Sequence, residues 1–355
     1  MEFLTAIFWL LAGGALLIAG GEIFVRGATA LALLLRVPPL VIGLTIVAAC
    51  TGAPEMAVSL TAALSGDEAR SGIALGNVVG SNICNILLVL GISAMVQPIK
   101  ISDRLVKLEI PFLIVVSGLV WLLAGFPCAD IEQERAIPRW GGAVFLVLCV
   151  GYYIWTVLSV KSGMFQQKRD QIDESFGSPA SEPVSEPASE SASEPAKGTA
   201  KSKAKSLLLA ILFLGVGLAM LIYGADFFVD GAVQIATLLK VSQWVIGLTV
   251  VAIGTSLPEL TVSILAAFSG KHDLAVGNVV GSNTFNILAI LGVTALLTAN
   301  GVRVSSDALF IDIPVMILTA VVGGYLCVTD RKLTRLEGTI LLLGFLVYEV
   351  SLFLR

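Results

Sequence analysis

Long apolar runs recur along this sequence, each about 20 residues long and almost free of charged side chains. A helix of that length crosses the hydrocarbon core of a lipid bilayer. The 355 residues are 56% hydrophobic and only 14% charged, whereas soluble domains average about 25% charged residues. The sequence therefore predicts an all-α, polytopic membrane protein. A net charge of −4 provides no basic surface for nucleic acid, and soluble enzymes are excluded as well.

Clusters of proline, glycine and charged residues divide the chain into ten expected transmembrane helices. We place them at 4–31, 38–65, 71–97, 105–126, 138–160, 206–236, 242–269, 273–299, 307–328 and 335–354. The first run follows Met1 and Glu2 without any Lys or Arg, so it is expected to be a membrane helix rather than a cleaved signal peptide. The five scattered cysteines are expected to be free thiols.

One polar stretch, 161–206, separates the fifth expected helix from the sixth. Its Ser, Glu and Pro composition cannot bury enough apolar surface to fold, so we expect a disordered linker between two units, 1–160 and 207–355. Lys and Arg favour the cytoplasmic side of a membrane. In the ten-helix arrangement, 16 of the 22 Lys and Arg residues fall on the linker's side. We therefore expect a cytoplasmic linker and both termini outside.

The two units carry the same sequence motifs. Residues 43–55 match 247–259 at 8 of 13 positions, and 76–91 match 277–292 at 12 of 16 positions. Because each unit has five expected helices, an odd number, the second copy must be inverted in the membrane relative to the first. Inverted repeats with interrupted helices near the membrane midplane are typical of secondary transporters.

Both repeats place polar side chains at steps of four residues within apolar helices, so that they share one helical face. In the first repeat these are Thr51, Glu55 and Ser59, then Asn77, Ser81 and Asn85; in the second they are Thr255, Glu259, Ser263, Asn278, Ser282 and Asn286. Pro54 and Pro258 each free a backbone carbonyl about one turn earlier. Gly76 and Gly277 allow neighbouring helices to approach closely.

Glu55 and Glu259 indicate the chemistry of the site. A charged side chain within a membrane helix costs about 2.5–3.5 kcal/mol, and neutral residues could hold helices together at lower cost. The surrounding hydroxyl, amide and carbonyl groups make an all-oxygen ligand set, which suits hard cations such as Ca²⁺. One Ca²⁺ neutralises two glutamates, and two or more Na⁺ could take its place. The sequence therefore predicts a site that exchanges one cation for another.

These motifs resemble those of the cation/Ca²⁺ exchangers, most closely the sodium/calcium exchangers. The resemblance rests on two alpha-repeats with the patterns Gly-Thr-Ser-x-Pro-Glu and Gly-Asn-x-x-Gly-Ser-Asn-x-x-Asn, and it covers both units outside the linker. It implies ten helices in two inverted five-helix repeats. Ions would bind between the second, third, seventh and eighth helices, while the first and sixth move against the rest.

The resemblance also implies which residues bind the cations. The matching positions are Thr51, Glu55, Ser81, Asn85, Thr255, Ser256, Glu259, Ser282 and Asn286, supported by Pro54, Pro258, Asn77, Asn278, Gly76 and Gly277. The repeated acidic residues Glu22, Asp226, Glu109 and Asp312 are expected to be structural.

Two departures from the family pattern concern the ions. Cys50 and Gly52 stand where the family usually has Gly and Ser, so Ser256 has no hydroxyl counterpart in the first repeat. The missing hydroxyl could change one sodium site or the usual ratio of Na⁺ to Ca²⁺. Because Asn occupies both 85 and 286, a third carboxylate is missing, and potassium dependence is not expected.

We expect an antiporter in which Na⁺ entry drives electrogenic Ca²⁺ extrusion by alternating access, with no cofactor. Two alternatives remain open: proton/calcium exchange through the same carboxylates, and a cation channel. The sequence contains no metalloprotease or hydrolase motif, so an enzyme is not expected. The compact size and the absence of eukaryotic regulatory domains favour a prokaryotic inner membrane. We expect a monomer in the lipid bilayer.

Overall fold

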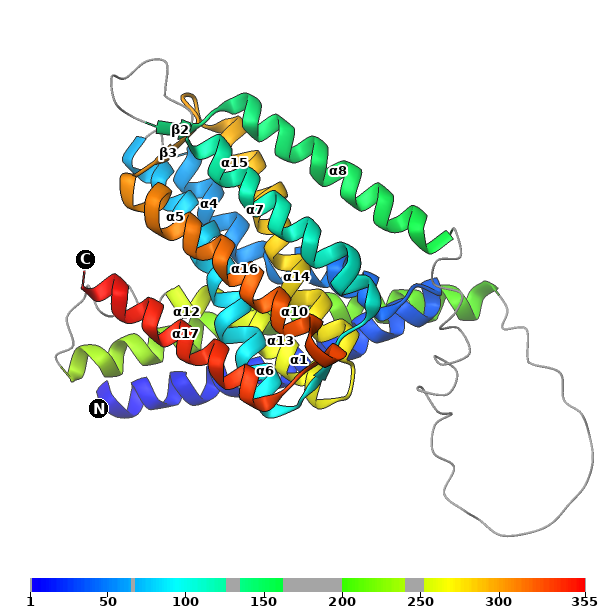
Figure 1. Ribbon diagram of the computed structural model, residues 1–355. Helices are drawn as coiled ribbons and strands as arrows, with labels where there is room; N and C mark the ends of the chain where they lie inside the picture. Colours follow the sequence, from blue (N-terminus) through cyan, green and yellow to red (C-terminus); the bar gives the residue numbers. More distant parts are fainter. Residues whose placement is uncertain (1, 65–67, 126–134, 162–199, 240–251, 355) are drawn as a thin grey trace, which may run out of the picture.

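The chain forms a helical bundle in a computed structural model that describes residues 2–64, 68–125, 135–161, 200–239 and 252–354 (Figure 1). Within these residues, seven helices are long and apolar enough to cross a membrane, and a bent helix pair adds an eighth if it counts as one span. The expected all-α, multi-pass architecture is confirmed. The count of ten helices stays a prediction, since part of the expected helix 242–269 lies outside the described chain.

The helical segments follow the expected spans in order. The first half contains α1 (Glu2–Leu35), α2 (Pro39–Ile42), η1 (Gly43–Val47), α3 (Ala48–Thr51), α4 (Ala53–Leu64), α5 (Glu68–Cys84), η2 (Asn85–Leu90), α6 (Gly91–Val96), η3 (Leu105–Glu109), α7 (Ile110–Ala124) and α8 (Arg139–Lys161). The second half contains α10 (Ala200–Leu238), α12 (Ala252–Thr255), α13 (Leu257–Phe268), α14 (His272–Phe285), η6 (Asn286–Leu291), α15 (Gly292–Leu297), η7 (Ala308–Asp312), α16 (Ile313–Val328), η8 (Thr329–Arg331) and α17 (Arg335–Phe353). All η segments are π-helical except η8, a 3₁₀ turn.

The start of α10 differs from our expectation for the linker. Residues 200–206, which we assigned to the disordered stretch, are the first turns of this helix. They consist of Ala, Lys and Ser only, and because Ala and Lys are strong helix formers, the helix continues beyond its apolar part. Residues 162–199 of the expected linker, and its expected disorder, lie outside the described residues.

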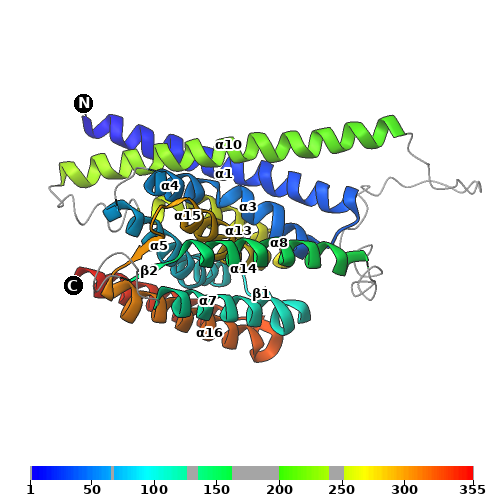
Figure 2. The same ribbon diagram turned by 90° about the horizontal axis from the view of Figure 1, so that it is seen from above.

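Three layers are visible when the bundle is seen from above (Figure 2). α1 and α10 lie side by side along one edge, and α7 and α16 lie along the opposite edge. The middle layer contains α4 and α5 of the first half together with α13 and α14 of the second half. These are the helices that carry the repeated motifs, so the fold places both motifs in its centre.

α1 and α10 pack against each other in antiparallel directions with their backbones in contact. Both helices carry glycines at seven-residue steps along the shared face: Gly13, Gly20 and Gly27 on α1, and Gly217, Gly224 and Gly231 on α10. A β-carbon added to Gly224 would lie 2.9 Å from the Leu17 nitrogen and 3.1 Å from the Gly13 oxygen. Small residues let membrane helices approach this closely, and the contact is made by van der Waals packing. The two helices therefore form one tightly packed pair.

Two short β-ribbons within the described residues connect the two halves, and the sequence did not lead us to expect them. β1 (Ile99–Lys100) pairs with β4 (Lys332–Leu333), and β2 (Arg135–Ile137) pairs with β3 (Val302–Val304), both antiparallel. In each ribbon, one strand comes from the first half and the other from the second half. Backbone hydrogen bonds thus join the connections between helices at two places.

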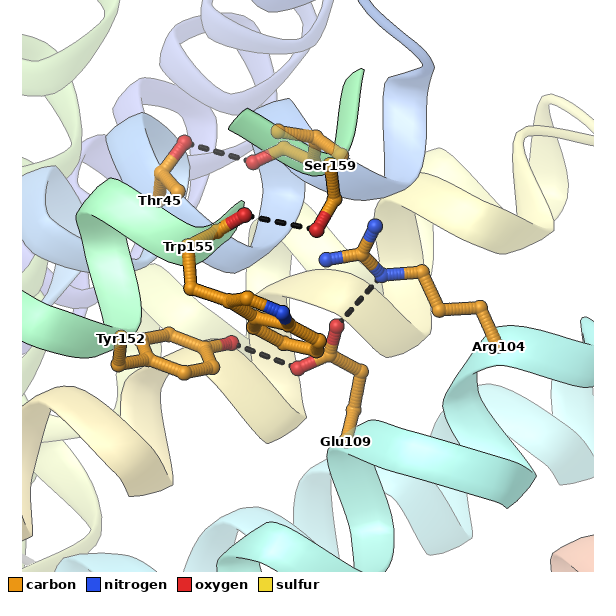
Figure 3. Close-up of polar contacts among 7 residues, drawn as sticks. Thr45, Arg104, Glu109, Tyr152, Trp155 and Ser159 are labelled. Carbon is orange, nitrogen blue, oxygen red and sulfur yellow. Dashed lines mark hydrogen bonds and ion pairs between the residues drawn. The ribbon is translucent and has the colours of Figure 1, made fainter. Parts of the chain in front are cut away.

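A buried ion pair fixes the beginning of α7 to α8 (Figure 3). The Arg104 Nε donates to Glu109 Oε1 at 2.7 Å, and the two side chains are 11% and 1% exposed. The Tyr152 hydroxyl of α8 donates to Glu109 Oε2 at 2.8 Å, and the guanidinium lies 5.1 Å from the centre of the Trp155 ring. Glu109, one of the repeated acidic residues, is therefore held in a structural cluster.

Replacing Glu109 is expected to destabilise the protein strongly. In Glu109→Gln the buried Arg104 loses its counter-charge, and breaking a buried ion pair in this way costs about 3–5 kcal/mol. Asp103→Asn is the matched control, because Asp103 is 72% exposed and exposed ion pairs contribute only about 0–1 kcal/mol. Thermal unfolding in lipid nanodiscs should show a large decrease in midpoint for the first variant alone. Equal midpoints would contradict a stabilising role of the pair.

A bulky side chain between α1 and α10 is expected to separate the pair. Gly224→Ile adds a side chain that the Leu17 and Gly13 backbones cannot avoid, and overpacking typically costs about 1–3 kcal/mol. Gly215→Ile on the same helix is the control, since a β-carbon there meets no described atom within 4 Å. The measurement is again the unfolding midpoint, with a decrease expected for Gly224→Ile only. Equal tolerance of both changes would show that the close contact does not hold the pair together.

Candidate cation-binding site

The site begins with a break in the helix that precedes each glutamate. Gly52 has φ −77° and ψ 6°, and Ser256 has φ −89° and ψ 5°, so both residues leave the helical conformation. The first break turns the helix axis by 47° between Pro39–Thr51 and Ala53–Leu64. Pro54 and Pro258, two residues further on, lack the N–H that would continue the helical ladder. The motifs thus place non-helical backbone in the interior of the bundle.

Glu55 and Glu259 come together from the two halves of the chain. Each residue is only 1% exposed, and the two carboxylates lie close enough to repel each other electrostatically. In each glutamate, Oε2 is buried and has no hydrogen-bond partner among the described residues. Buried polar atoms are nearly always hydrogen-bonded, so these two oxygens are available to a ligand.

Three neutral side chains, those of Asn85, Asn286 and Ser256, also offer oxygens to a ligand. Asn85 Oδ1, Asn286 Oδ1 and Ser256 Oγ are buried and lack a hydrogen-bond partner in the described part of the chain. Asn85 begins η2, which packs on α13, the helix of Glu259, and Asn286 begins η6, which packs on α4, the helix of Glu55. Five buried oxygens from both repeats therefore surround the centre of the bundle, and a bound cation would satisfy them.

The two asparagines occupy equivalent positions in the backbone. Asn85 is the first residue of η2 and Asn286 is the first residue of η6. Single π-helical turns within α-helices occur frequently at functional sites, because they shift side chains relative to the regular ladder. The change of helix type in both repeats thus begins at a candidate ligand.

Hydroxyl groups from both repeats meet beside Glu259. The Thr51 Oγ1 donates to Asn278 Oδ1 at 3.1 Å, lies 3.5 Å from Ser282 Oγ, and is next to the Glu259 side chain. Thr51 and Ser282 are fully buried. Of the remaining candidates, Ser81 is buried in α5, and Thr255 is partly exposed at the end of α12. The structure therefore brings most predicted ligands into one buried region.

Asn77 and Asn278 connect the two motif helices within each repeat. Asn77 Nδ2 donates to the Glu55 carbonyl at 3.1 Å and to Ser59 Oγ at 2.9 Å. In the second repeat, Asn278 Nδ2 donates to the Glu259 carbonyl at 3.4 Å and to Ser263 Oγ at 3.0 Å. These amides hold the backbone of each glutamate in place, so both asparagines position the carboxylates.

The sequence analysis missed Asn82 and Asn283, which connect α5 to α14. Asn283 Nδ2 donates to the Asn82 carbonyl at 3.1 Å, and Asn286 Nδ2 donates to Asn82 Oδ1 at 3.5 Å. This second contact turns the amide of Asn286 so that its oxygen is left for a ligand. The available signal was the heptapeptide that is identical in both repeats, because Asn82 and Asn283 are its last residues.

The donor set suits a hard cation. The described residues hold no group of three or more His, Cys, Asp or Glu side chains that could bind a transition metal. Two carboxylates with neutral amide and hydroxyl oxygens match the oxygen ligands that Ca²⁺ takes in proteins. Such a set has a charge of −2 and can be neutralised by one divalent or two monovalent cations.

Comparisons with known proteins show which family the chain belongs to. The model of the family described as "Sodium/calcium exchanger protein" matches residues 5–158 and 209–354. The chain is 37% identical to the putative antiporter CaxA of Alkalimonas amylolytica, over 99% of each chain. It is 32% identical to the sodium/calcium exchanger MaX1 of Methanosarcina acetivorans, over 97% of each chain. The inner membrane protein YrbG of Escherichia coli is 32% identical, over 99% of this chain and 97% of YrbG.

A solved structure has the same fold. The sodium-calcium exchanger NCX_Mj, soaked with Na⁺ in the absence of Ca²⁺, superposes with a TM-score of 0.74 and 30% identity, over 99% of each chain. The family is one of transporters, in keeping with our expectation that the chain is not an enzyme. From the matched segments and the full-length relatives, the chain belongs to the sodium/calcium exchanger family.

Proposed function

We propose that this protein exchanges Na⁺ for Ca²⁺ across a prokaryotic inner membrane, with the site centred on Glu55 and Glu259. The observation that carries the proposal is the pair of buried carboxylates, one from each repeat, each with an oxygen that lacks a hydrogen-bond partner. Family membership supports the transport of cations and Ca²⁺ in general, and the name of MaX1 supports Na⁺ as the coupling ion.

The charge of the site explains why transport is an exchange. An empty site with two ionised glutamates would expose a charge of −2 to a low-dielectric interior, where an isolated charge is very costly. The site therefore changes its exposure from one side of the membrane to the other only when cations fill it. One Ca²⁺ or two Na⁺ restore neutrality, so the two ions replace each other.

The neutral oxygens favour sodium over protons as the coupling ion. A proton would satisfy one carboxylate oxygen and leave Asn85 Oδ1, Asn286 Oδ1 and Ser256 Oγ without a partner. A Na⁺ ion is a hard cation that takes several oxygen ligands at once. The unpartnered neutral oxygens are accordingly the specific observation in favour of sodium/calcium rather than proton/calcium exchange.

The movement that opens the site to each side is assigned to α1 and α10. Their close contact makes them a single unit, and α1 also packs on α13, where a β-carbon on Gly21 would meet Leu265 and Thr261. Displacement of this pair relative to the central layer would uncover one side of the site and cover the other. In this proposal the linker faces the cytoplasm and both termini face outward.

The test is uptake of ⁴⁵Ca²⁺ into proteoliposomes that are preloaded with Na⁺. The wild type is expected to take up Ca²⁺ only with an outward Na⁺ gradient. Glu55→Gln and Glu259→Gln should each reduce the rate by at least about tenfold, which corresponds to about 1.4 kcal/mol in the activation barrier. Asp103→Asn removes one exposed carboxylate and serves as the matched control, with activity expected to remain.

The other outcomes identify the alternatives. Uptake that ignores Na⁺ and follows an imposed pH gradient would establish proton/calcium exchange. Uptake that needs neither gradient, accompanied by single-channel currents, would indicate a cation channel. Full activity in both glutamate variants would refute the proposed site.

A further inference from the structure

We infer that Glu349 of α17 is a third acidic residue that acts on the transported cations, and that its charge favours Ca²⁺ over Na⁺ at the Ser256 end of the site. The sequence analysis did not single out this residue. The inference rests on the sodium/calcium exchange proposed above. It assigns a part in ion selectivity to a helix outside the four that carry the repeated motifs.

The carboxylate of Glu349 has an unsatisfied oxygen within the expected membrane helix 335–354. Its side chain is partly buried, and Oε2 is buried without a hydrogen-bond partner among the described residues. Ionisable side chains within membrane helices are costly, and they typically mark ion pathways when they face the interior of the bundle. A buried negative charge of this kind is stabilised by a positive charge nearby.

The packing of α17 brings Glu349 level with the centre of the bundle. α17 packs on α6 and η2 (Figure 1). A β-carbon on Gly338 would lie 2.6 Å from the Gly91 oxygen, and one on Gly344 would lie 3.6 Å from Leu87 Cδ2. As α17 advances, its neighbours on the other helix therefore have lower residue numbers, so the two helices are antiparallel. The same course brings Glu349, five residues beyond Gly344, to the last turn of α5.

A row of polar side chains leads from Glu349 to Ser256. Glu349 is close enough to the Cys84 thiol to act on it electrostatically, and the same thiol lies next to the Ser256 side chain. Glu55 and Glu259 also act on Cys84, so all three carboxylates lie within electrostatic range of this thiol. The charge of Glu349 therefore lies behind one end of the cation site.

Glu349 acts from outside the set of ligands. The described residues contain no group of three His, Cys, Asp or Glu side chains that could hold one metal ion, so its carboxylate does not join Glu55 and Glu259 around a single cation. A negative charge still stabilises a cation at a distance, and between buried groups this attraction is little screened. Glu349 is therefore a positioning residue for the cations.

The equivalent position in the first repeat carries no charge. Gly142 of α8 and Gly338 of α17 make the same contact, because a β-carbon on either would lie 2.7 or 2.6 Å from the oxygen of a glycine in the neighbouring helix. Eleven residues further on, α8 has Tyr153 and α17 has Glu349. The Tyr153 hydroxyl is buried and likewise lacks a hydrogen-bond partner in the described part of the chain. A neutral group and a carboxylate thus occupy matching places.

The neighbours of the two helix breaks differ in the same sense. A β-carbon on Gly52 would lie 3.1 Å from Phe285 Cδ1, whereas Ser256 lies next to the Cys84 thiol. The first break therefore has an apolar ring beside it, and the second has a polar side chain that leads on to a carboxylate. The additional negative charge acts on one end of the site only.

The charge of Glu349 acts twice as strongly on Ca²⁺ as on each Na⁺. At a given distance the Coulomb energy is proportional to the charge of the ion. Removal of this carboxylate therefore multiplies the dissociation constant of Ca²⁺ by the square of the factor that applies to each Na⁺. The relation holds for any number of bound Na⁺ ions, and a residue with only a packing role would not produce it.

The first test measures cation binding to the purified protein in nanodiscs. Binding of ⁴⁵Ca²⁺ gives the half-saturating Ca²⁺ concentration, and its displacement by Na⁺ gives the Na⁺ value after correction for the competing Ca²⁺. Glu349→Gln should raise the Na⁺ value about threefold and the Ca²⁺ value about tenfold, as the charge of each ion requires. Glu349→Asp keeps the charge and should remain close to the wild type. Unchanged values in Glu349→Gln would overturn the inference.

A second variant separates the charge from the shape of the side chain. Glu349→Ala removes the whole side chain and should produce the same two shifts as Glu349→Gln, and it decides the question if the glutamine variant does not fold. Tyr153→Phe is the matched control, because it removes a neutral hydroxyl at the equivalent position, and no shift is expected. Equal factors for Ca²⁺ and Na⁺, or different factors in the two Glu349 variants, would contradict an electrostatic role.

Failure of the inference and failure of the proposed function give different results. Uptake driven by Na⁺ in the wild type, together with unchanged affinities in Glu349→Gln, would overturn the inference alone and leave sodium/calcium exchange standing. Wild-type protein from which Na⁺ does not displace Ca²⁺ would refute sodium coupling, and the selectivity role of Glu349 with it.

Discussion

Electrostatic repulsion between Glu55 and Glu259 in the membrane interior is the constraint on which the rest of the structure depends. Two like charges at this depth are stable only when something holds their backbones in place and something neutralises them. The protein supplies the first through the Asn77 and Asn278 amides, which bind the carbonyls of the two glutamates. In the function proposed here, the transported ions supply the second. The stability of the centre and the transport activity are therefore linked.

Duplication explains why this arrangement recurs on both sides of the bundle, but the copies are no longer equal. The first repeat has the buried Arg104–Glu109 pair, whereas Asp307 stands at the position equivalent to Arg104 in the second repeat. Gly52 and Ser256 differ in a similar way. A transporter made of two identical repeats would have the same energy when open to either side. Each difference of this kind can make one of the two states more stable than the other.

The sequence predicted the motif helices and most candidate ligands, because spacing along one helix determines which side chains share a face. It did not predict contacts between residues far apart in the chain. The pairing of Ile99 with Leu333, the contact of Gly52 with Phe285 and the bond from Asn283 to the Asn82 carbonyl all depend on how the halves dock. The helical start of α10 was missed for another reason, since composition favoured disorder while local helix propensity prevailed.

The lengths of α1 and α10 have a consequence for the surrounding membrane. Their apolar spans, Phe3–Leu35 and Ala204–Leu238, have 33 and 35 residues. At 1.5 Å per residue they would be about 50 and 53 Å long, well beyond a hydrocarbon core of about 30 Å. Helices that exceed the bilayer thickness tilt or deform the lipids around them. If this pair moves during each cycle, its tilt and the lipid thickness next to it change as well. The acyl-chain length of the lipids would then change the turnover rate through the energy needed to tilt the pair, without a lipid binding at a specific site.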